Sequence, residues 1–308
     1  MSIKEAIVNE LHKPARVRYP RRRILLKGID DLWQLDLIEM IPYARENNGY
    51  KYILTVIDCF SKYAWVKPVK SKTGQDVAKA METIFKSSGR VPNNIQTDNG
   101  KEFYNAIFNK LMKLYNINHY STYSQIKSSI VERFNRTFKS MLYRRFSLQG
   151  SYKYIKQLSD LIQNYNNKVH RTIGMKPSEV NKNNESSILT TVYSAIDGRR
   201  KEKQRFKEGD YVRISKNRTV FDKGYTPNWS AEIFKIKTVR KTTPYTYLLQ
   251  DMTGQLIQGA FYNEELQKAR YKNVYLVEKI KKRKDNKVLV QWLGFSKPSW
   301  INKNNLIN

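Results

Sequence analysis

The spacing of hydrophobic residues changes along the first part of the chain, and this change predicts where strands lie. Residues 32–40 form a short apolar run that is interrupted in its middle by the acid Asp36, as expected for a strand covered on both faces. Two runs rich in β-branched and aromatic residues, 50–60 and 64–69, follow the turn signal Asn48-Gly49. Three strands are therefore predicted in this region.

Helical spacing begins at residue 73. Residues 73–88 carry apolar side chains three and four apart and end at Gly89. A short strand at 94–97 leads into Asp98, and another strand is predicted at 117–123. The helix between these two strands has its apolar positions at Phe103, Ile107, Leu111 and Leu114. Three strands followed by alternating helices and strands predict an α/β fold with a mixed sheet flanked by helices.

The next segment, residues 124–139, has the pattern of an amphipathic helix. Its predicted buried stripe recurs every four residues and consists of Ile126, Ile130, Phe134 and Phe138. Glu132 lies on the opposite face, together with Arg136 and Lys139. This polar face is either the wall of an active site for a polyanion or a solvated surface with a Glu132–Arg136 pair.

The second half of the chain is expected to be rich in short strands. One more helix is predicted at 152–169, and polar segments at 181–187 and 198–204 mark the edges of a linker. Strand candidates then follow at 211–214, 233–239, 245–249 and 255–261, and their spacing predicts a small all-β barrel. The tail is expected to form a smaller β unit with strands at 274–280 and 288–292 around a charged turn at 281–287.

The charge of the chain indicates a polyanionic partner. The formal net charge is +30 over 308 residues, which favours nucleic acid or an anionic membrane surface. The chain has no run of 18 apolar residues and no apolar core of a signal peptide, so nucleic acid is favoured. The basic start of the chain, with Arg21, Arg22 and Arg23, is interpreted as an arm that lies on phosphates; a solvated tail is the alternative.

The number and spacing of cysteines and histidines exclude both a disulfide framework and a structural zinc site. Cys59 is the only cysteine, so a disulfide framework within the chain is excluded. The three histidines, His12, His119 and His170, have no ligand-type spacing. A structural zinc site needs four clustered Cys or His ligands, which this chain does not supply.

Three carboxylates on separate predicted elements are the candidate catalytic residues. Asp36 lies inside a predicted buried strand, Asp98 at the end of another, and Glu132 on the polar face of a helix. An ionised carboxylate inside an apolar strand is costly unless it is paired or bound to a metal. Mg²⁺ or Mn²⁺ would remove the repulsion among three converging carboxylates. The alternative is that Asp36 pairs with a buried Lys or Arg and that Asp98 caps the following helix.

Four motifs give the chain a resemblance to a known family. They are Trp33-Gln-Leu-Asp36, Asp58-Cys-Phe-Ser61, Thr97-Asp-Asn-Gly-Lys-Glu-Phe103 and Val131-Glu-Arg-Phe-Asn-Arg-Thr137. Together they resemble the retroviral-type integrase catalytic core, a ribonuclease H-like fold of the DDE transposase superfamily. The resemblance covers residues 28–182 and implies that Asp36, Asp98 and Glu132 hold catalytic Mg²⁺ or Mn²⁺. Gln125 and Ser129 depart from the family's usual loop residues, which puts the shape of that loop in question.

The barrel region has a resemblance of its own. Residues 206–213 and 223–234 resemble the SH3-like DNA-binding domain of integrases from retroelements and Maverick/Polinton transposons. This resemblance makes four basic residues candidate phosphate contacts: Arg213, Lys216, Arg218 and Lys223. Trp229 and Tyr225 are interpreted as barrel core in preference to base-stacking platforms.

The tail is similar to a chromodomain. Such domains bind methyl-lysine in an aromatic cage, and the matching positions here are Tyr275, Trp292 and Phe295. The acidic residues that usually follow the position of Trp300 are missing. These three rings are therefore either a cage for histone tails or ordinary core.

Taken together, these patterns predict five segments and one main function. The segments are a basic arm (1–27), an integrase core (28–182), a linker (183–204), an SH3-like domain (205–268) and a chromodomain-like module (269–308). We expect a nuclear, multimeric transposon integrase that trims element 3′ ends and joins them to target DNA. The alternatives are a domesticated protein that only binds DNA or chromatin, and a nuclease without strand transfer.

Overall fold

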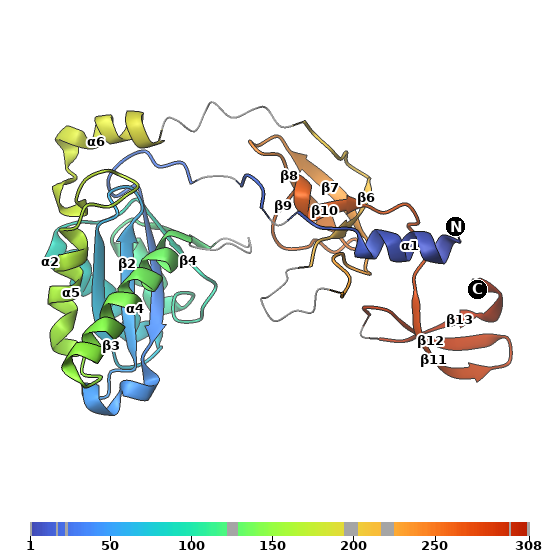
Figure 1. Ribbon diagram of the computed structural model, residues 1–308, viewed down its shortest axis with the longest axis horizontal. Coiled ribbons are helices and arrows are strands. Elements are labelled where there is room, and N and C mark those ends of the chain that lie inside the picture. Colours follow the sequence, from blue (N-terminus) through green and yellow to red (C-terminus); the bar gives the residue numbers. More distant parts are fainter. Residues whose placement is uncertain are drawn as a thin grey trace. The chain divides into compact units, whose positions relative to one another are not determined.

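The computed structural model describes residues 2–16, 18–21, 24–121, 129–193, 203–216, 225–295 and 297–306. The chain forms two compact units (Figure 1). The core unit is Arg23–Arg199, and the terminal unit combines Met1–Arg22 with Arg200–Asn308. Among the described residues, no helix combines the length and the apolar character needed to span a membrane.

A five-stranded mixed sheet forms the centre of the core unit, which confirms the predicted α/β class. Its strands lie in the order β3-β2-β1-β4-β5. Strand β2 is antiparallel to both β1 and β3, whereas β4 is parallel to both β1 and β5. The strands are β1 (Leu32–Glu39), β2 (Tyr52–Asp58), β3 (Ala64–Val69), β4 (Asn94–Thr97) and β5 (Asn118–Ser121).

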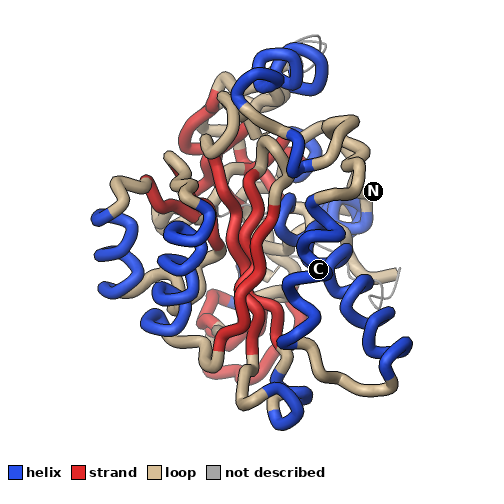
Figure 2. The backbone as a smooth tube through the Cα atoms, turned by 90° about the vertical axis from the view of Figure 1, so that its left-hand side faces the viewer, coloured by secondary structure: helices blue, strands red, loops and turns tan. Residues whose placement is uncertain are grey.

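Helices cover both faces of this sheet (Figure 2). One face packs against α2 (Gly74–Ser88) and α3 (Ala106–Leu114), and the other against α4 (Ser129–Gln149) and α5 (Leu158–Asn166). Short helical turns complete the unit: η1 (Ile41–Tyr43), η2 (Arg45–Asn47), η3 (Ile155–Gln157) and η4 (Pro177–Glu179). The helix predicted at 152–169 is therefore a 3₁₀ turn followed by a shorter helix.

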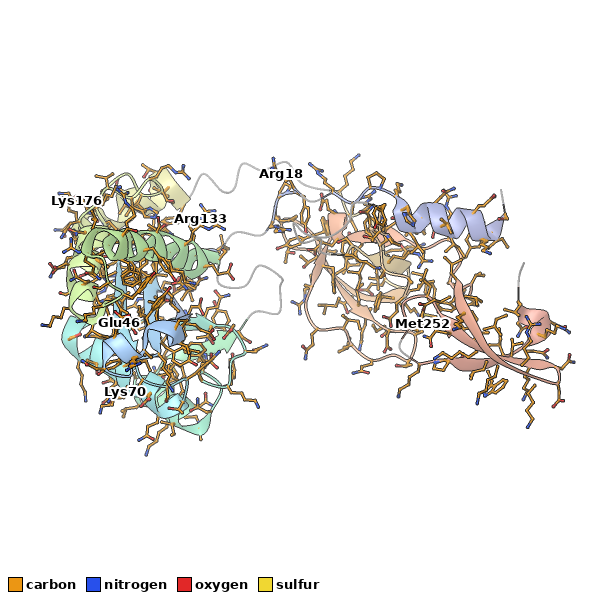
Figure 3. All side chains as sticks on the ribbon, turned by 60° about the horizontal axis from the view of Figure 1, so that its bottom comes forward. Arg18, Glu46, Lys70, Arg133, Lys176 and Met252 are labelled. Atoms are coloured by element: carbon orange, nitrogen blue, oxygen red, sulfur yellow. The ribbon has the colours of Figure 1, made fainter. Side chains whose placement is uncertain are left out.

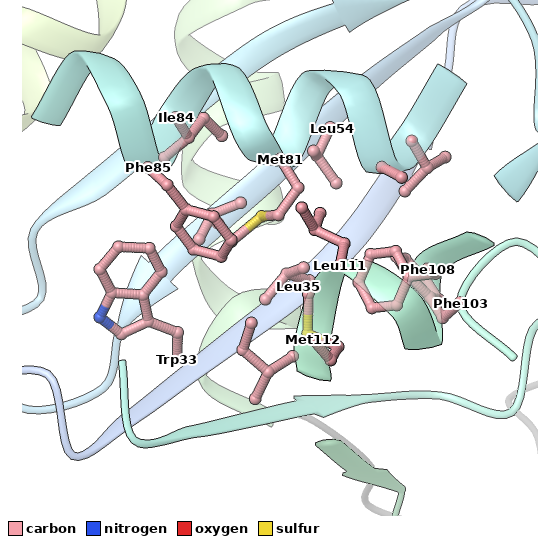
Figure 4. Packing of buried hydrophobic residues seen from close by; sticks show 14 of the residues in the cluster. Trp33, Leu35, Leu54, Met81, Ile84, Phe85, Phe103, Phe108, Leu111 and Met112 are labelled. Atoms are coloured by element: carbon pink, nitrogen blue, oxygen red, sulfur yellow. The ribbon is translucent and has the colours of Figure 1, made fainter. Parts of the chain in front are cut away.

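Helix α2 forms where its end signals predicted it. The Thr73 side chain accepts a hydrogen bond from the Asp76 amide, and Gly89 ends the helix with a positive φ of 65°. Its buried face packs over the sheet beside Trp33, as the close view shows for Met81 and Phe85 (Figure 4). This packing forms one of the two cores that hold β1 in place.

The predicted face of α3 is partly wrong. Ile107 is 51% exposed and Leu114 is 74% exposed, whereas Phe108 and Met112 are buried. The reason lies in the start of the helix, where the Asn105 side chain accepts a hydrogen bond from the Phe108 amide. The residues before Asn105 belong to a loop and do not set the phase of the helix.

Helix α4 extends ten residues beyond its predicted end. Phe134 and Phe138 are buried as predicted, Ile130 is half-buried, and Ile126 and Gln125 lie outside the described residues. Ser129 is the first residue of the helix. The side chains that pack α4 on the sheet are Val131, Phe134, Phe138, Leu142 and Phe146.

The predicted linker is wrong for residues 183–193, which are folded. They lie in α6 (Lys182–Ile188) and the π-helical turn η5 (Leu189–Tyr193). Glu185 accepts a hydrogen bond from the Ile29 amide at 2.5 Å, and the Tyr193 hydroxyl donates to the Phe60 carbonyl at 2.8 Å. These contacts tie the segment to the rest of the core unit.

The terminal unit contains two antiparallel sheets. The first has the order β10-β6-β7-β8-β9, with β6 (Tyr211–Ile214), β7 (Phe234–Arg240), β8 (Thr246–Gln250), β9 (Phe261–Tyr262) and β10 (Leu266–Lys268). The strand predicted at 255–261 is wrong except for its last residue. The second sheet has the order β11-β12-β13, with β11 (Val277–Lys284), β12 (Lys287–Trp292) and β13 (Ser299–Asn302), followed by the turn η8 (Lys303–Asn305).

The charged turn predicted at 281–287 is also wrong. Strand β11 continues through Lys284, and the turn itself is Asp285-Asn286 between the two paired strands. Asp285 has a positive φ of 48°, a conformation that Asp tolerates better than most residues. The basic residues of this segment therefore lie on a strand.

The first residues of the chain form a helix that packs within the terminal unit, whereas phosphate binding by the basic arm stays a prediction. Helix α1 (Ile3–His12) buries Ile7 and Leu11 beside Trp229. The Trp229 indole donates to the Lys13 carbonyl at 2.8 Å. Trp229 is core, as predicted, whereas Tyr225 is 72% exposed and is not.

Candidate active site

The strand register places Asp36 and Asp98 at the same level of the sheet. In the parallel pair β1–β4, Leu32 lies opposite Asn94 and Gln34 opposite Gln96, a constant offset of 62 residues (94 − 32). Asp98 follows β4 directly and keeps this offset from Asp36 (98 − 36 = 62). The two aspartates thus lie on neighbouring chain segments at the carboxyl end of β4.

A buried glutamine joins this strand pair to helix α4. The Gln34 side-chain amide donates to Gln96 at 2.9 Å, and its oxygen accepts from the backbone amides of Ile130 and Val131, each at 3.0 Å. Amides in the first turn of a helix have no partner within the helix. Gln34 therefore caps α4 from a neighbouring strand and fixes the turn that carries Glu132.

A second contact ties α4 directly to the first aspartate. The Asn135 side chain donates to Asp36 Oδ2 at 2.7 Å, and the Leu37 amide donates to Asp36 Oδ1 at 2.8 Å. Glu132 lies three residues before Asn135, close to one helical turn away. The contacts with Gln34 and Asp36 therefore hold α4 against the middle of β1.

Burial and neighbouring charges raise the pKa values of two of the candidate carboxylates, Asp36 and Glu132. Burial raises the pKa of Asp36, and the charge of Asp98 raises it further, while the Leu37 amide and Lys139 oppose the rise. Burial also raises the pKa of Glu132, with a further contribution from the charge of Asp36. The charge of Asp98 thus makes ionisation of Asp36 less favourable, and the charge of Asp36 does the same for Glu132.

The contacts of these acids differ from the alternative roles, which were ion pairs for Asp36 and Glu132 and a helix cap for Asp98. Asp98 accepts a hydrogen bond from the Gly100 amide at 3.0 Å, which closes a turn, while Asn105 caps α3. Within the described residues, Asp36 forms no ion pair with a buried Lys or Arg. The same part of the chain contains no ion pair between Glu132 and Arg136.

The side-chain atoms of this site are of the chemical type that binds hard divalent cations such as Mg²⁺. All are oxygens, and the buried Asn135 Oδ1 has no hydrogen-bond partner beside Asp36. Carboxylate and amide oxygens are preferred ligands of Mg²⁺ and Ca²⁺. In the described ranges, however, no three His, Cys, Asp or Glu side chains converge closely enough to hold one ion.

The residues predicted to contact DNA differ in their exposure. Arg136 and Lys139 are exposed on the same face of α4 as Glu132, and the labelled Arg133 projects from this helix (Figure 3). Lys216 is exposed after β6. Arg22, Arg23, Arg218 and Lys223 lie outside the described residues.

Two other predicted phosphate contacts are engaged within the protein. Arg213 is 1% exposed, donates to the carbonyls of Ser230 and Ala231, and lies 3.5 Å from Glu10. Its interior position is opposite to the surface position that was predicted. Arg21 stacks over the ring of Tyr19, with 4.4 Å between the guanidinium carbon and the ring centroid.

The three aromatic residues of the predicted cage do lie together. The ring centroid of Tyr275 is 6.2 Å from that of Trp292 and 5.4 Å from that of Phe295. All three side chains are half-buried. Their grouping is compatible with both a cage and a small core, so methyl-lysine binding stays a prediction.

Sequence reasoning missed the polar residues that position the site. Gln34, Gln96 and Asn135 are all buried, and Gln34 is fully so. The available signal was a polar residue two positions before Asp36, on the same face of an otherwise apolar strand.

Comparison with known proteins agrees with this geometry. A family model described as the integrase core domain matches residues 29–124. The transposon-derived protein F54H12.3 of Caenorhabditis elegans is 37% identical over 205 residues, which are 67% of this chain and 68% of that protein. The chain belongs to the retroviral-type integrase core family.

Viral relatives of this integrase-family chain match it over shorter stretches. The Gag-Pol polyprotein of Baboon endogenous virus is 32% identical over 151 residues, which are 48% of the chain and 8% of the polyprotein. The solved intasome of simian T-cell lymphotropic virus, in complex with PP2A regulatory subunit B56 gamma, contains a chain of similar structure. The TM-score is 0.57 at 16% identity, over 87% of this chain and 91% of that one, a likeness that shows the fold.

Proposed function

We propose that the protein is an active DNA integrase of a transposable element. Its reaction would be hydrolysis at the element's 3′ ends, followed by in-line attack of each freed 3′-hydroxyl on a target phosphodiester. The observation that carries this proposal is the shared register of Asp36 and Asp98 beneath the helix turn that bears Glu132.

In this proposal Asp36, Asp98 and Glu132 hold Mg²⁺ or Mn²⁺. When bound, two such ions activate an attacking oxygen and stabilise a leaving oxygen at phosphorus. Burial, followed by repulsion from a neighbouring carboxylate, raises the pKa values of Asp36 and Glu132, and this repulsion favours binding of cations there. Asn135 and Gln34 would keep the carboxylates at a fixed separation.

Exposed basic side chains beside the carboxylates are the proposed DNA contacts. Arg136 and Lys139 project from the helix face that bears Glu132, where they would contact phosphates flanking the scissile bond. Lys216, Arg218 and Lys223 are proposed as further phosphate contacts. Joining two element ends in one event requires more than one subunit, so we propose that the protein acts as a multimer in the nucleus.

The proposal also includes the type of transposon from which the chain derives and the role of its C-terminal module. The resemblance of residues 206–213 and 223–234 favours Maverick/Polinton transposons as the origin. The grouped rings of Tyr275, Trp292 and Phe295 support a chromodomain-like module that binds methyl-lysine of histone tails by cation–π attraction.

A strand-transfer assay tests the main proposal. Purified protein with Mn²⁺ should nick duplex oligonucleotides that carry the element's terminal repeat and join them to plasmid DNA. Asp98→Asn and Glu132→Gln should each abolish joining, with DNA binding retained. Joining at the wild-type rate by either variant would refute the assignment, while a wild-type chain that binds DNA without joining would favour a domesticated protein.

A further inference from the structure

The three-stranded sheet β11–β12–β13 has two faces of different character. On β12, Val288 and Val290 are 2% and 0% exposed and lie on the inner face. Side chains alternate along a strand, so Lys287, Leu289 and Gln291 lie on the opposite face, called here the outer face.

The strand register identifies the neighbours on the outer face. Residues directly opposite one another in antiparallel strands share a face. Leu289 pairs with Lys282 on one side and with Trp300 on the other. The complete outer face consists of Lys279, Lys282, Lys284, Lys287, Leu289, Gln291, Trp300 and Asn302.

The charge of this sheet is concentrated and unpaired. The hairpin at residues 277–287 contains six cations and two acids, and every one of the six cations is exposed. None of the six forms an ion pair with another described residue. Lys284 lies directly opposite Lys287, a like-charge pair that destabilises a free hairpin. An anionic ligand would relieve this repulsion.

An exposed tryptophan lies among these charges. Trp300 is 46% exposed, and its ring stacks on no other ring in the described part of the chain. The outer face thus presents the ammonium of Lys282 on one side of Leu289 and the flat ring of Trp300 on the other.

Protection of a sheet edge accounts for only part of this arrangement. Lysines on edge strands prevent pairing with other sheets, and β11 is an edge strand. Lys287, however, lies on the central strand β12. An exposed Trp300 on the other edge promotes association and does not prevent it. The combination of aromatic and basic residues is typical of surfaces that bind unpaired bases.

We propose that the outer face binds single-stranded nucleic acid. The ammonium groups of Lys282, Lys284 and Lys287 contact successive phosphates, and the Trp300 ring stacks on a base. A duplex offers phosphates but no free base face, so only the single strand satisfies both features. This binding is additional to the proposed catalysis and requires neither a metal nor the three carboxylates.

Fluorescence anisotropy with the full-length Glu132→Gln chain tests this proposal without consuming DNA. The probes are a fluorescein-labelled single-stranded oligonucleotide and the same sequence as a duplex. Trp300→Ala should weaken binding of the single strand about tenfold and leave the duplex unchanged. Trp300→Phe, which keeps a ring, should restore most of the affinity.

The lysines are tested by the salt dependence of binding. Lys282→Ala/Lys284→Ala/Lys287→Ala should reduce the slope of log Kd against log salt concentration by about 2 for the single strand, at about 0.7 per phosphate contact. The control Lys79→Ala/Lys110→Ala/Lys113→Ala removes the same charge from exposed positions of α2 and α3 and should leave the slope unchanged. Equal slopes for the two triple variants would overturn the proposal, as would unchanged single-strand affinity in Trp300→Ala.

Photo-crosslinking tests the outer face without mutating it, so the result does not depend on whether the variants fold correctly. A single strand containing bromodeoxyuridine, irradiated with the Glu132→Gln chain, should crosslink to the peptide that contains Trp300. Crosslinks confined to other peptides would refute the proposal even if the variants bind poorly. Because no catalytic step is measured, these results are separate from the fate of the integrase assay.

Discussion

Gln34 and Val131 form a 3.0 Å hydrogen bond that joins the central strand of the sheet to the first turn of α4. The same Gln34 oxygen also accepts from the Ile130 amide. Since Glu132 directly follows Val131, this contact sets the distance between the helix carboxylate and Asp36. The geometry of the candidate site thus depends on a side chain that has no charge and no part in the chemistry.

Gln34→Ala is expected to reduce strand transfer about a hundredfold, because small displacements of catalytic groups have effects of this size. The loss should appear in the rate at saturating DNA, with little change in DNA affinity. Stability should fall by about 1–3 kcal/mol, since two buried amides lose their acceptor. Gln96→Ala is the matched control: it leaves both amide contacts of Gln34 intact and should have a much smaller effect on rate. Equal rates in Gln34→Ala and the wild type would contradict the positioning role.

Stability should depend on pH through Asp36 and Glu132. Their pKa values are raised in the folded protein above the ordinary values of 3.8 and 4.5. The folded state therefore holds these protons more tightly, and the associated stability is present below the ordinary values and is lost as pH rises through the raised ones. Asp36→Asn should increase the free energy of unfolding at pH 7 but have little effect at pH 3. Urea denaturation at both pH values, without divalent ions, measures the difference.

Magnesium provides a control for the same variant. Mg²⁺ should raise the melting temperature of the wild-type chain because binding to the folded state alone stabilises it. The rise should be smaller in Asp36→Asn, and K⁺ at the same ionic strength should not reproduce it. A rise of equal size in both chains would show that the ion binds elsewhere.

Glu10→Ala is expected to destabilise the terminal unit by about 3–5 kcal/mol, because it leaves the buried Arg213 guanidinium without its carboxylate. The double variant Glu10→Met/Arg213→Met should recover most of that loss, since replacement of both charges removes the unpaired group. Hydrogen exchange of β6 and β10 amides in the full chain measures this effect locally. Equal exchange in Glu10→Ala and the wild type would contradict a structural role for the pair.

Arg136→Ala/Lys139→Ala should weaken duplex binding and lower the salt slope by about 2, at about 0.9 per phosphate contact. The control Lys79→Ala/Lys86→Ala removes equal charge from α2 on the other face of the sheet. A salt titration of duplex binding measures both slopes. If the control lowers the slope as much as the α4 variant does, binding depends on the total charge of the chain and not on the positions of Arg136 and Lys139.

Much of the core unit could be predicted from local sequence signals. Thr73 and Gly89 mark the two ends of α2, and the runs at β3 and β4 coincide with the observed strands. The acids of the candidate site could also be named, because Asp36 interrupts an apolar strand. Local signals were sufficient for α2, β3 and β4, whereas for α3 they gave the helix but not its buried face.

The remaining features depend on contacts between residues distant in sequence. Gln34 and Ile130 are 96 positions apart, and Glu10 lies about 200 residues from Arg213. No periodicity predicts such pairs, so the charge of Arg213 and the resemblance of its segment to a DNA-binding domain placed it on the surface. The charged segment at 281–287 was misassigned for a related reason, since pairing with β12 outweighs the low strand propensity of lysine.

The packing of α1 on the terminal unit has a consequence for synthesis on the ribosome. Ile7 and Leu11 are made more than 200 residues before Trp229, which covers them. Throughout translation of the core unit, α1 must remain without its partner, so the core can complete its fold before the terminal unit begins. A nascent chain stalled before Trp229 should therefore expose an apolar helix to chaperones and proteases, and release of the full chain should protect it.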